Sequence, residues 1–114
     1  MEGMSLREEM EKRGLVFPDE EPKAKKHEEI CRRLTDLYRR KNRDYGDSFG
    51  KSYEKHGMAM PLIRIGDKLS RLENLCKPGV DAEVKDESII DTLMDLANYS
   101  IMTIIALEGV DDLK

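Results

Sequence analysis

Three carboxylates and one amide recur at helical spacing near the C-terminal end of the sequence. Glu87, Asp91 and Asp95 follow one another every four residues, and Asn98 comes three residues after the last of them. At about 100° per residue, all four fall within an arc of roughly 80° on one helix face. Carboxylate oxygens at this spacing could hold Mg²⁺, a hard cation that is often bound together with substrate phosphates.

This acidic face has two other interpretations. Like charges four residues apart on a helix repel each other, so positive groups should lie opposite them. Arg64, Lys68 and Arg71 gather on one face of an earlier predicted helix, and they could supply salt bridges in place of a metal or beside it. A solvated outer face fits less well, because Met102 and Ile105 occupy the same angular sector further along. We therefore expect the acidic face to point inward throughout.

Segments with helical hydrophobic periodicity must position these residues. One amphipathic segment covers about residues 25–40, a second runs from residue 61 or 62 to Cys76, and a third runs to Leu107 from Asp86, a good N-cap. A short helix is predicted between Ser5 and Gly14. The sequence shows no internal repeat and no alternation of β period. It predicts an all-α protein, a bundle of three main helices plus the short N-terminal helix, completed by oligomerisation.

Length and composition indicate one domain. A chain of 114 residues suffices for a single modest core. We assign residues 1–22 to an N-terminal arm and linker, and residues 23–114 to the all-α domain. No continuous apolar run approaches the roughly eighteen residues of a membrane span, and a signal-peptide core is absent. We expect a cytoplasmic protein without a membrane partner.

The charges are unevenly distributed around a net charge of −4. Residues 1–22 carry −4, residues 23–77 carry +7 and residues 78–114 carry −7. A basic middle and an acidic end suit an anion and a divalent cation bound together, although helices that attract each other across a bundle would give the same pattern. We do not expect duplex nucleic acid as the main partner, because the overall balance is acidic and aromatic residues are scarce.

The stretch KNRDYGDSFGKSYEKHGMAMP, which connects the first two strong helices, is rich in glycine and aromatic residues. A polar connection of this length in so small a domain is usually functional or partly helical. Glycines let the backbone approach a ligand closely. An ordinary helix–helix connection fits the spacing equally well.

Three stretches, KNRDYGDSF, IRIGDKLSRLENL and DESIIDTLMDLANYSIM, resemble the phage and bacterial family called nucleotide modification associated domain 1, formerly a domain of unknown function. The resemblance covers about residues 27–107. It implies a role in nucleotide modification without naming a reaction.

More distantly, the third strong helix is similar to that of the all-α nucleoside triphosphate pyrophosphohydrolases, the MazG and dimeric dUTPase group. Those enzymes hold Mg²⁺ against a triphosphate with acids from two helices. Asp91 and Asn98 match an acid–amide pair of that group, whereas Glu87 lies four residues before Asp91 instead of three. The second helix has Arg64 and Asp67 where the group has an E-x-x-E pair, so one expected metal ligand is replaced.

The sequence therefore predicts a nucleotide-binding protein, assembled as a homodimer or larger homo-oligomer. The favoured activity is Mg²⁺-dependent hydrolysis of a (deoxy)nucleoside triphosphate to release pyrophosphate, and the alternative is a non-catalytic nucleotide binder or accessory protein. The predicted magnesium ligands are Asp67, Glu87, Asp91 and Asp95, with Asp67 and Asp91 also catalytic. The predicted substrate contacts are Lys41, Asn42, Asp44 and Tyr45 at the entrance, Arg64, Lys68 and Arg71 at the phosphates, and Asn98 at the sugar or base.

Overall fold

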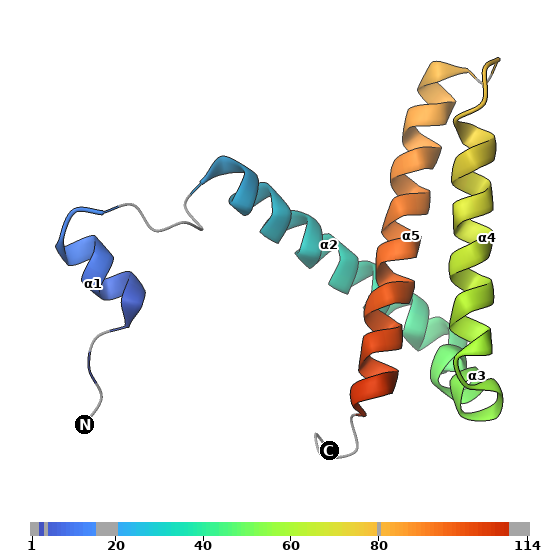
Figure 1. Cartoon of the computed structure of the whole chain (residues 1–114), viewed down its shortest axis with the longest axis horizontal. Helices are drawn as coiled ribbons and strands as arrows, with labels where there is room; N and C mark the ends of the chain where they lie inside the picture. Colours follow the sequence, from blue (N-terminus) through green and yellow to red (C-terminus); the bar gives the residue numbers. More distant parts are fainter. Residues whose placement is uncertain (1–2, 4, 16–20, 80, 110–114) are drawn as a thin grey trace. The chain divides into compact units, whose positions relative to one another are not determined.

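The computed structural model describes residues 3, 5–15, 21–79 and 81–109, and every regular element in this part of the chain is a helix. The helices are α1 (Leu6–Lys12), α2 (Pro22–Tyr45), α3 (Ser48–His56), α4 (Ala59–Leu75) and α5 (Ala82–Glu108), as Figure 1 shows. The predicted all-α class is confirmed.

The chain divides into two compact units, Met1–Asp36 and Leu37–Lys114, and the boundary falls inside α2. The domain boundary predicted from the sequence lies at the start of this helix, between residues 22 and 23, and it stays a prediction.

The first unit contains α1 and the first part of α2. The Ser5 hydroxyl accepts a hydrogen bond from the backbone N–H of Glu8 at 3.2 Å and so caps α1. At the start of α2, the Glu21 carboxylate accepts hydrogen bonds from the N–H groups of Lys23 and Ala24, both at 3.0 Å. Pro22 occupies the first helical position, where its missing N–H costs nothing. These contacts explain why α2 begins three residues before its predicted start at residue 25.

The second unit is built around an antiparallel pair of helices, α4 and α5, which lie side by side along their length (Figure 1). Helix α3 packs against both of them. The face that α5 turns inward includes Thr92 and Thr103, which are 2% and 7% exposed. Their hydroxyls donate to the carbonyls of Ser88 and Tyr99, both at 2.6 Å, so that burial leaves neither of these donors unsatisfied.

Helix α3 lies within the connection that was predicted to be functional or partly helical, and its partly helical character is confirmed. Gly46 and Asp47 both have left-handed backbone conformations, with φ of 58° and 57°, and they turn the chain between α2 and α3. A Cβ added at Gly50 would lie 2.6 Å from Oδ2 of Asp47, which is the end of a side chain that can move away. The left-handed turn at Gly46 and Asp47 therefore separates α2 from α3.

The third strong helix starts earlier than predicted. Helix α5 begins at Ala82, so that Asp86 lies inside the helix and the prediction that it is the N-cap is wrong. Helix α2 likewise continues past the predicted end at residue 40 to Tyr45, because residues 41–45 contain neither proline nor glycine to stop it.

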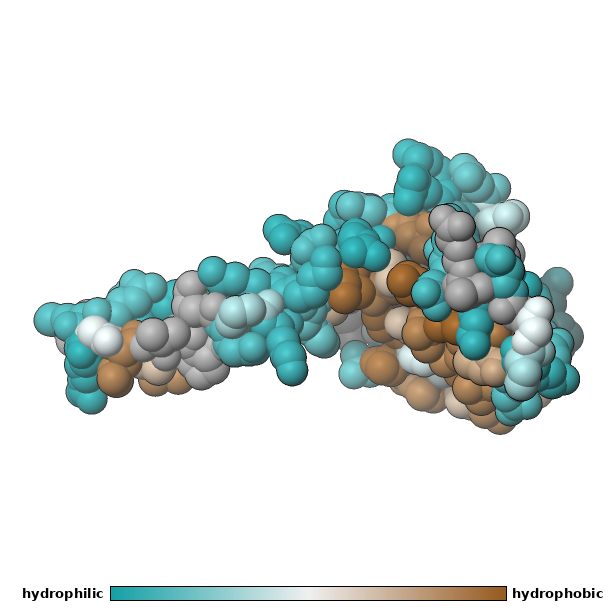
Figure 2. Space-filling view, turned by 90° about the horizontal axis from the view of Figure 1, so that it is seen from above, coloured by the Kyte–Doolittle hydropathy of each residue, from teal (hydrophilic) through white to brown (hydrophobic). Residues whose placement is uncertain are grey.

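Part of the α5 surface is apolar and exposed. Ile90, Leu93, Ile101 and Ile104 are between 43% and 52% exposed. By helical rotation they form one stripe about 80° wide, which we call the apolar stripe. Figure 2 shows hydrophobic surface over the region of α4 and α5.

The segment Lys85–Glu108 of α5 is long and apolar enough, by length and composition alone, to cross a membrane. Asp91 and Asp95 interrupt the segment, so that the sequence contains no continuous apolar run of that length. A helix that packs against protein in a soluble molecule satisfies the same two criteria. The expectation of no membrane partner therefore stays a prediction.

Candidate functional site

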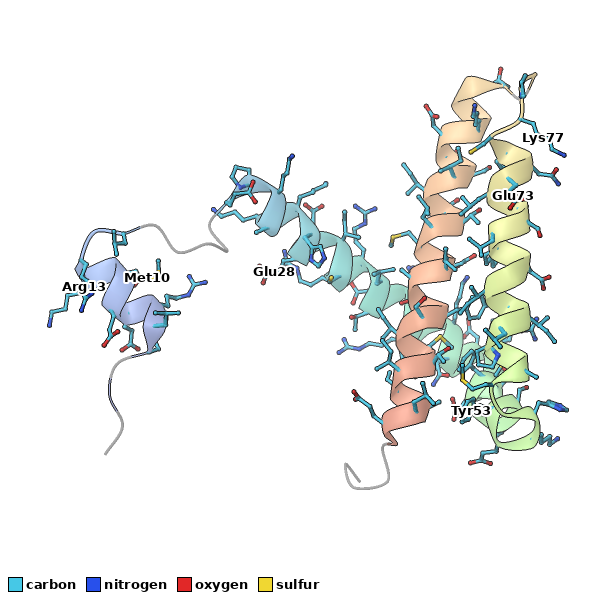
Figure 3. The ribbon with its side chains drawn as sticks, viewed as in Figure 1. Met10, Arg13, Glu28, Tyr53, Glu73 and Lys77 are labelled. Atoms are coloured by element: carbon cyan, nitrogen blue, oxygen red, sulfur yellow. The ribbon has the colours of Figure 1, made fainter. Side chains whose placement is uncertain are left out.

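A cavity of about 450 Å³ lies in the second unit, at the end of the α4–α5 pair where α3 packs. Figure 3 marks this end of the pair by Tyr53 and the opposite end by Glu73 and Lys77. The volume falls within the range of about 300–1,000 Å³ that is usual for small-molecule sites. The lining residues are Tyr38, Lys41, Asn42 and Tyr45 of α2, Ser48, Phe49 and Ser52 of α3, Met60 and Arg64 of α4, and Asp95, Asn98, Tyr99 and Met102 of α5.

Aromatic rings form much of the cavity wall. The sequence contains six aromatic residues, and four of them line this one cavity. The rings of Phe49 and Tyr99 are stacked, with centroids 6.1 Å apart and planes inclined by 24°. Tyr45, which is 69% exposed, stands at the rim. Such a wall offers flat apolar faces against which a planar group such as a nucleobase can stack.

A carboxylate with two lysine partners forms the charged part of the cavity. Oδ1 of Asp95 accepts a hydrogen bond from Nζ of Lys41 at 3.1 Å, and Oδ2 accepts one from Nζ of Lys68, also at 3.1 Å. These three residues come from α5, α2 and α4, so the ion pairs tie three helices together at the cavity. We refer to Lys41, Asp95 and Lys68 as the lysine–aspartate triad.

The triad changes the acidity of its carboxyl group. Burial alone would raise the pKa of Asp95, but the hydrogen bonds and positive charges of Lys68 and Lys41 outweigh it and hold the pKa below its ordinary value. Asp95 is therefore ionised at neutral pH and holds both ammonium groups in place.

This pKa predicts a pH-dependent contribution to stability. Because the folded-state pKa lies below the unfolded value of about 3.9, ionised Asp95 stabilises the fold above that pH and loses this contribution as the pH falls through the folded-state pKa. We expect the free energy of unfolding of the wild type to drop more steeply on acidification below about pH 5 than that of Asp95→Asn. Urea unfolding followed by circular dichroism at stepped pH measures both curves. Parallel curves would contradict a stabilising triad.

The structure brings most of the predicted substrate contacts together. The cavity is lined by Lys41, Asn42, Tyr45, Arg64 and Asn98, all of which were predicted. Lys68 does not line the cavity, but its Nζ donates to Asp95, which does. Asp44 is exposed on α2 and does not line the cavity. Arg71 also lies outside it, and its Nε donates to the hydroxyl of Thr92 at 3.1 Å.

The predicted magnesium ligands are dispersed. Glu87, Asp91 and Asp67 are exposed, and only Asp95 lines the cavity. The expectation that the acidic face points inward throughout is therefore wrong. Asp95, Asn98 and Met102 line the cavity together with residues of α2 and α3, whereas Asp91 and Glu87, one and two turns before Asp95, are exposed.

The donor set described by the structure does not fit a magnesium ion within one copy of the chain. Among the residues that the structure describes, no three His, Cys, Asp or Glu side chains lie close enough to hold a metal ion. Both oxygens of the one cavity carboxylate accept hydrogen bonds from lysines. Magnesium binding stays a prediction, and no step below depends on it.

Sequence reasoning missed much of the apolar cavity wall. Tyr38 lies in the segment of about residues 25–40, which was recognised only as an amphipathic helix, and Phe49 lies in the glycine-rich stretch that was recognised only as a whole. Tyr99 directly follows Asn98, so its position on α5 offered a signal that was not used. The missed lining residues are Tyr38, Ser48, Phe49, Ser52, Met60, Tyr99 and Met102.

Comparison with protein-family models matches residues 41–107 to the family described as nucleotide modification associated domain 1. The matched range covers more than half of the chain and holds every cavity-lining residue except Tyr38. No curated protein and no solved structure matches the chain. The more distant similarity to the pyrophosphohydrolases stays a prediction.

Proposed function

We propose, for a chain that belongs to the nucleotide modification associated domain 1 family, that the cavity of its second unit binds a nucleotide. One observation supports this most strongly: four aromatic rings and two cationic side chains, Lys41 and Arg64, line the same cavity. A nucleotide is a planar base joined to an anionic phosphate, and these two kinds of lining group complement its two ends.

The lining residues suggest a division of roles. The base stacks against the wall formed by Phe49 and Tyr99, because that wall is apolar and aromatic. Lys41 and Arg64 donate hydrogen bonds to phosphate oxygens. The amides of Asn42 and Asn98 can both donate and accept, and they are suited to a base edge or a sugar hydroxyl.

Binding without hydrolysis is the better supported of the two predicted activities. A Mg²⁺-dependent pyrophosphohydrolase needs several carboxylates at the phosphates, whereas among the residues that the structure describes Asp95 alone supplies a carboxylate to the cavity lining. Hydrolysis of a nucleoside triphosphate remains the second candidate, because Asp95 lies in the same cavity as Arg64 and Asn98.

Phosphorus NMR separates the two activities. Purified protein is incubated with a panel of nucleoside triphosphates and Mg²⁺, and release of pyrophosphate is followed while binding is measured by calorimetry. We expect binding without turnover. We also expect Asp91→Ala to bind nucleotide as the wild type does, because Asp91 is exposed and lies outside the cavity. Turnover that Asp91→Ala abolishes would contradict the binding-only proposal and favour the hydrolase.

We further propose that the chain is a homodimer whose copies meet at the apolar stripe of α5. A stripe of exposed large aliphatic side chains along a helix is costly in water, and a two-fold axis lets two such stripes cover each other. A bilayer fits this helix less well, because Glu87 and Asp91 are also exposed on α5 and charged groups are costly in lipid.

A further inference from the structure

We infer that the ligand of the cavity is a nucleoside monophosphate, bound as a dianion without a divalent metal ion. This inference rests on the proposed nucleotide-binding function and specifies the class of nucleotide.

The charges at the cavity suit a single phosphate group. The charged lining residues are Lys41, Arg64 and Asp95, which leave an excess of one positive charge. Lys68 does not line the cavity but donates to Asp95, and it raises the excess to two. A phosphate monoester carries about −1.5 to −2 at neutral pH. The dianion therefore balances the cavity without any further counter-ion.

The triad positions the ammonium groups of its two lysines before a phosphate binds. An ammonium group has three N–H donors, and Lys41 uses one of them on Asp95. Its side chain is 53% exposed, so that the remaining donors can reach a ligand. Because Asp95 bridges Lys41 and Lys68, the two ammonium groups are already positioned before the anion arrives, which lowers the entropic cost of binding.

Arg64 adds a second kind of phosphate donor. It lines the cavity and is exposed, and within the described part of the chain its guanidinium has no ion-pair or hydrogen-bond partner. A guanidinium without a protein partner can offer two parallel N–H groups to one phosphate. Arg64 and Lys41 therefore provide two separate contacts to a terminal phosphate.

A triphosphate fits this arrangement less well. It carries about twice the charge of a monoester and is normally bound together with Mg²⁺ through protein carboxylates. Within the described part of the chain, Asp95 is the one carboxylate that lines the cavity, and both of its oxygens already accept hydrogen bonds from lysines. Binding a triphosphate with its metal would require the triad to break.

Isothermal titration calorimetry at neutral pH tests this inference. The ligands are the four common deoxynucleoside monophosphates and their nucleosides in EDTA, and the corresponding triphosphates with EDTA or with Mg²⁺. We expect at least one monophosphate to bind in EDTA about tenfold or more tightly than its nucleoside, since hydrogen bonds to a charged phosphate are stronger than those between neutral groups. We expect no triphosphate to bind more tightly than that monophosphate.

Two outcomes would overturn the inference and leave nucleotide binding intact. One is a monophosphate that binds no more tightly than its nucleoside, and the other is a triphosphate that binds more tightly with Mg²⁺ than any monophosphate does in EDTA. If no nucleotide and no nucleoside binds, both the inference and the proposed function fail.

Arg64→Gln is expected to weaken binding of the monophosphate about tenfold or more and to leave binding of the nucleoside unchanged. Arg43→Gln is the matched control, because Arg43 is an exposed arginine of the same unit that does not line the cavity. If Arg64→Gln loses the same factor of affinity for the monophosphate and for the nucleoside, or loses affinity for neither, a phosphate contact at Arg64 is contradicted.

Discussion

Phe49→Ala is expected to weaken nucleotide binding about tenfold or more. The Phe49 ring lines the cavity and stacks on Tyr99, with centroids 6.1 Å apart, so its removal takes away both a stacking face and the support of the neighbouring ring. Stacking of a base on an aromatic side chain contributes about 1–3 kcal/mol, which corresponds to a loss of roughly five- to 150-fold. Calorimetric titration of the nucleotide that the wild type binds best measures the change.

Two further variants separate stacking from general damage to α3. Tyr53→Ala removes an aromatic ring from the same helix at a position that does not line the cavity, and it should bind nucleotide like the wild type. Phe49→Leu keeps apolar volume without an aromatic face, and it should lose most of the affinity that Phe49→Ala loses. Full affinity in Phe49→Ala, with folding verified by circular dichroism, would show that the base does not stack on this wall.

Ile104→Lys is expected to convert a dimer into a monomer of 13.2 kDa. Ile104 is 52% exposed and belongs to the apolar stripe, so a two-fold interface there would place the new ammonium group near its own copy and among apolar side chains. Burying an unpaired charge costs several kcal/mol per ion and would occur in both copies. Sedimentation equilibrium over a range of protein concentrations measures the mass.

The matched control is Glu87→Lys, which also introduces a lysine on α5 but on the exposed acidic face. It should leave the mass of the assembly unchanged. A wild type that is monomeric at all concentrations would contradict the proposed dimer. So would a dimer that Glu87→Lys dissociates but Ile104→Lys leaves intact.

Periodicity predicted the helices well because each main helix has a continuous apolar side. The 25–40 segment lies within α2 and the segment ending at residue 107 matches α5, whereas the 61–76 segment matches α4 except for Cys76, which caps the C-terminal end of that helix. Their ends were harder to predict, because capping by Glu21 and Pro22 extends α2 and because nothing in residues 82–85 prevents α5 from starting before Asp86. Local contacts that stop or start a helix are weaker signals than repeated apolar side chains.

The sequence predicted the charged and amide residues of the cavity but not its aromatic wall. Charged and amide residues such as Lys41, Arg64 and Asn98 were identified by their chemistry, and the structure places them together. The aromatic residues Phe49 and Tyr99 meet across a long separation in the sequence, which no periodicity within a single helix reveals.

The acidic face shows a second limit of helical periodicity. Angular position correctly placed Asp95, Asn98 and Met102 on one side of α5, and all three line the cavity. It could not show where along the axis the covering helices end, and Asp91 and Glu87 are therefore exposed. It also could not predict that threonines form the buried face, because Thr92 and Thr103 are satisfied by carbonyls of their own helix.

Mapping the binding site by NMR tests the central claim most directly. A ¹⁵N-labelled sample of the full chain is titrated with the four deoxynucleoside monophosphates, and the backbone amide shifts are followed. We expect the largest changes in the three cavity-lining segments, around residues 38–52, 60–64 and 95–102, with saturation at a defined stoichiometry. If no nucleotide changes the amide shifts, a nucleotide site in this cavity is contradicted. The same holds if the largest shift changes lie around Glu73 and Lys77, at the opposite end of α4.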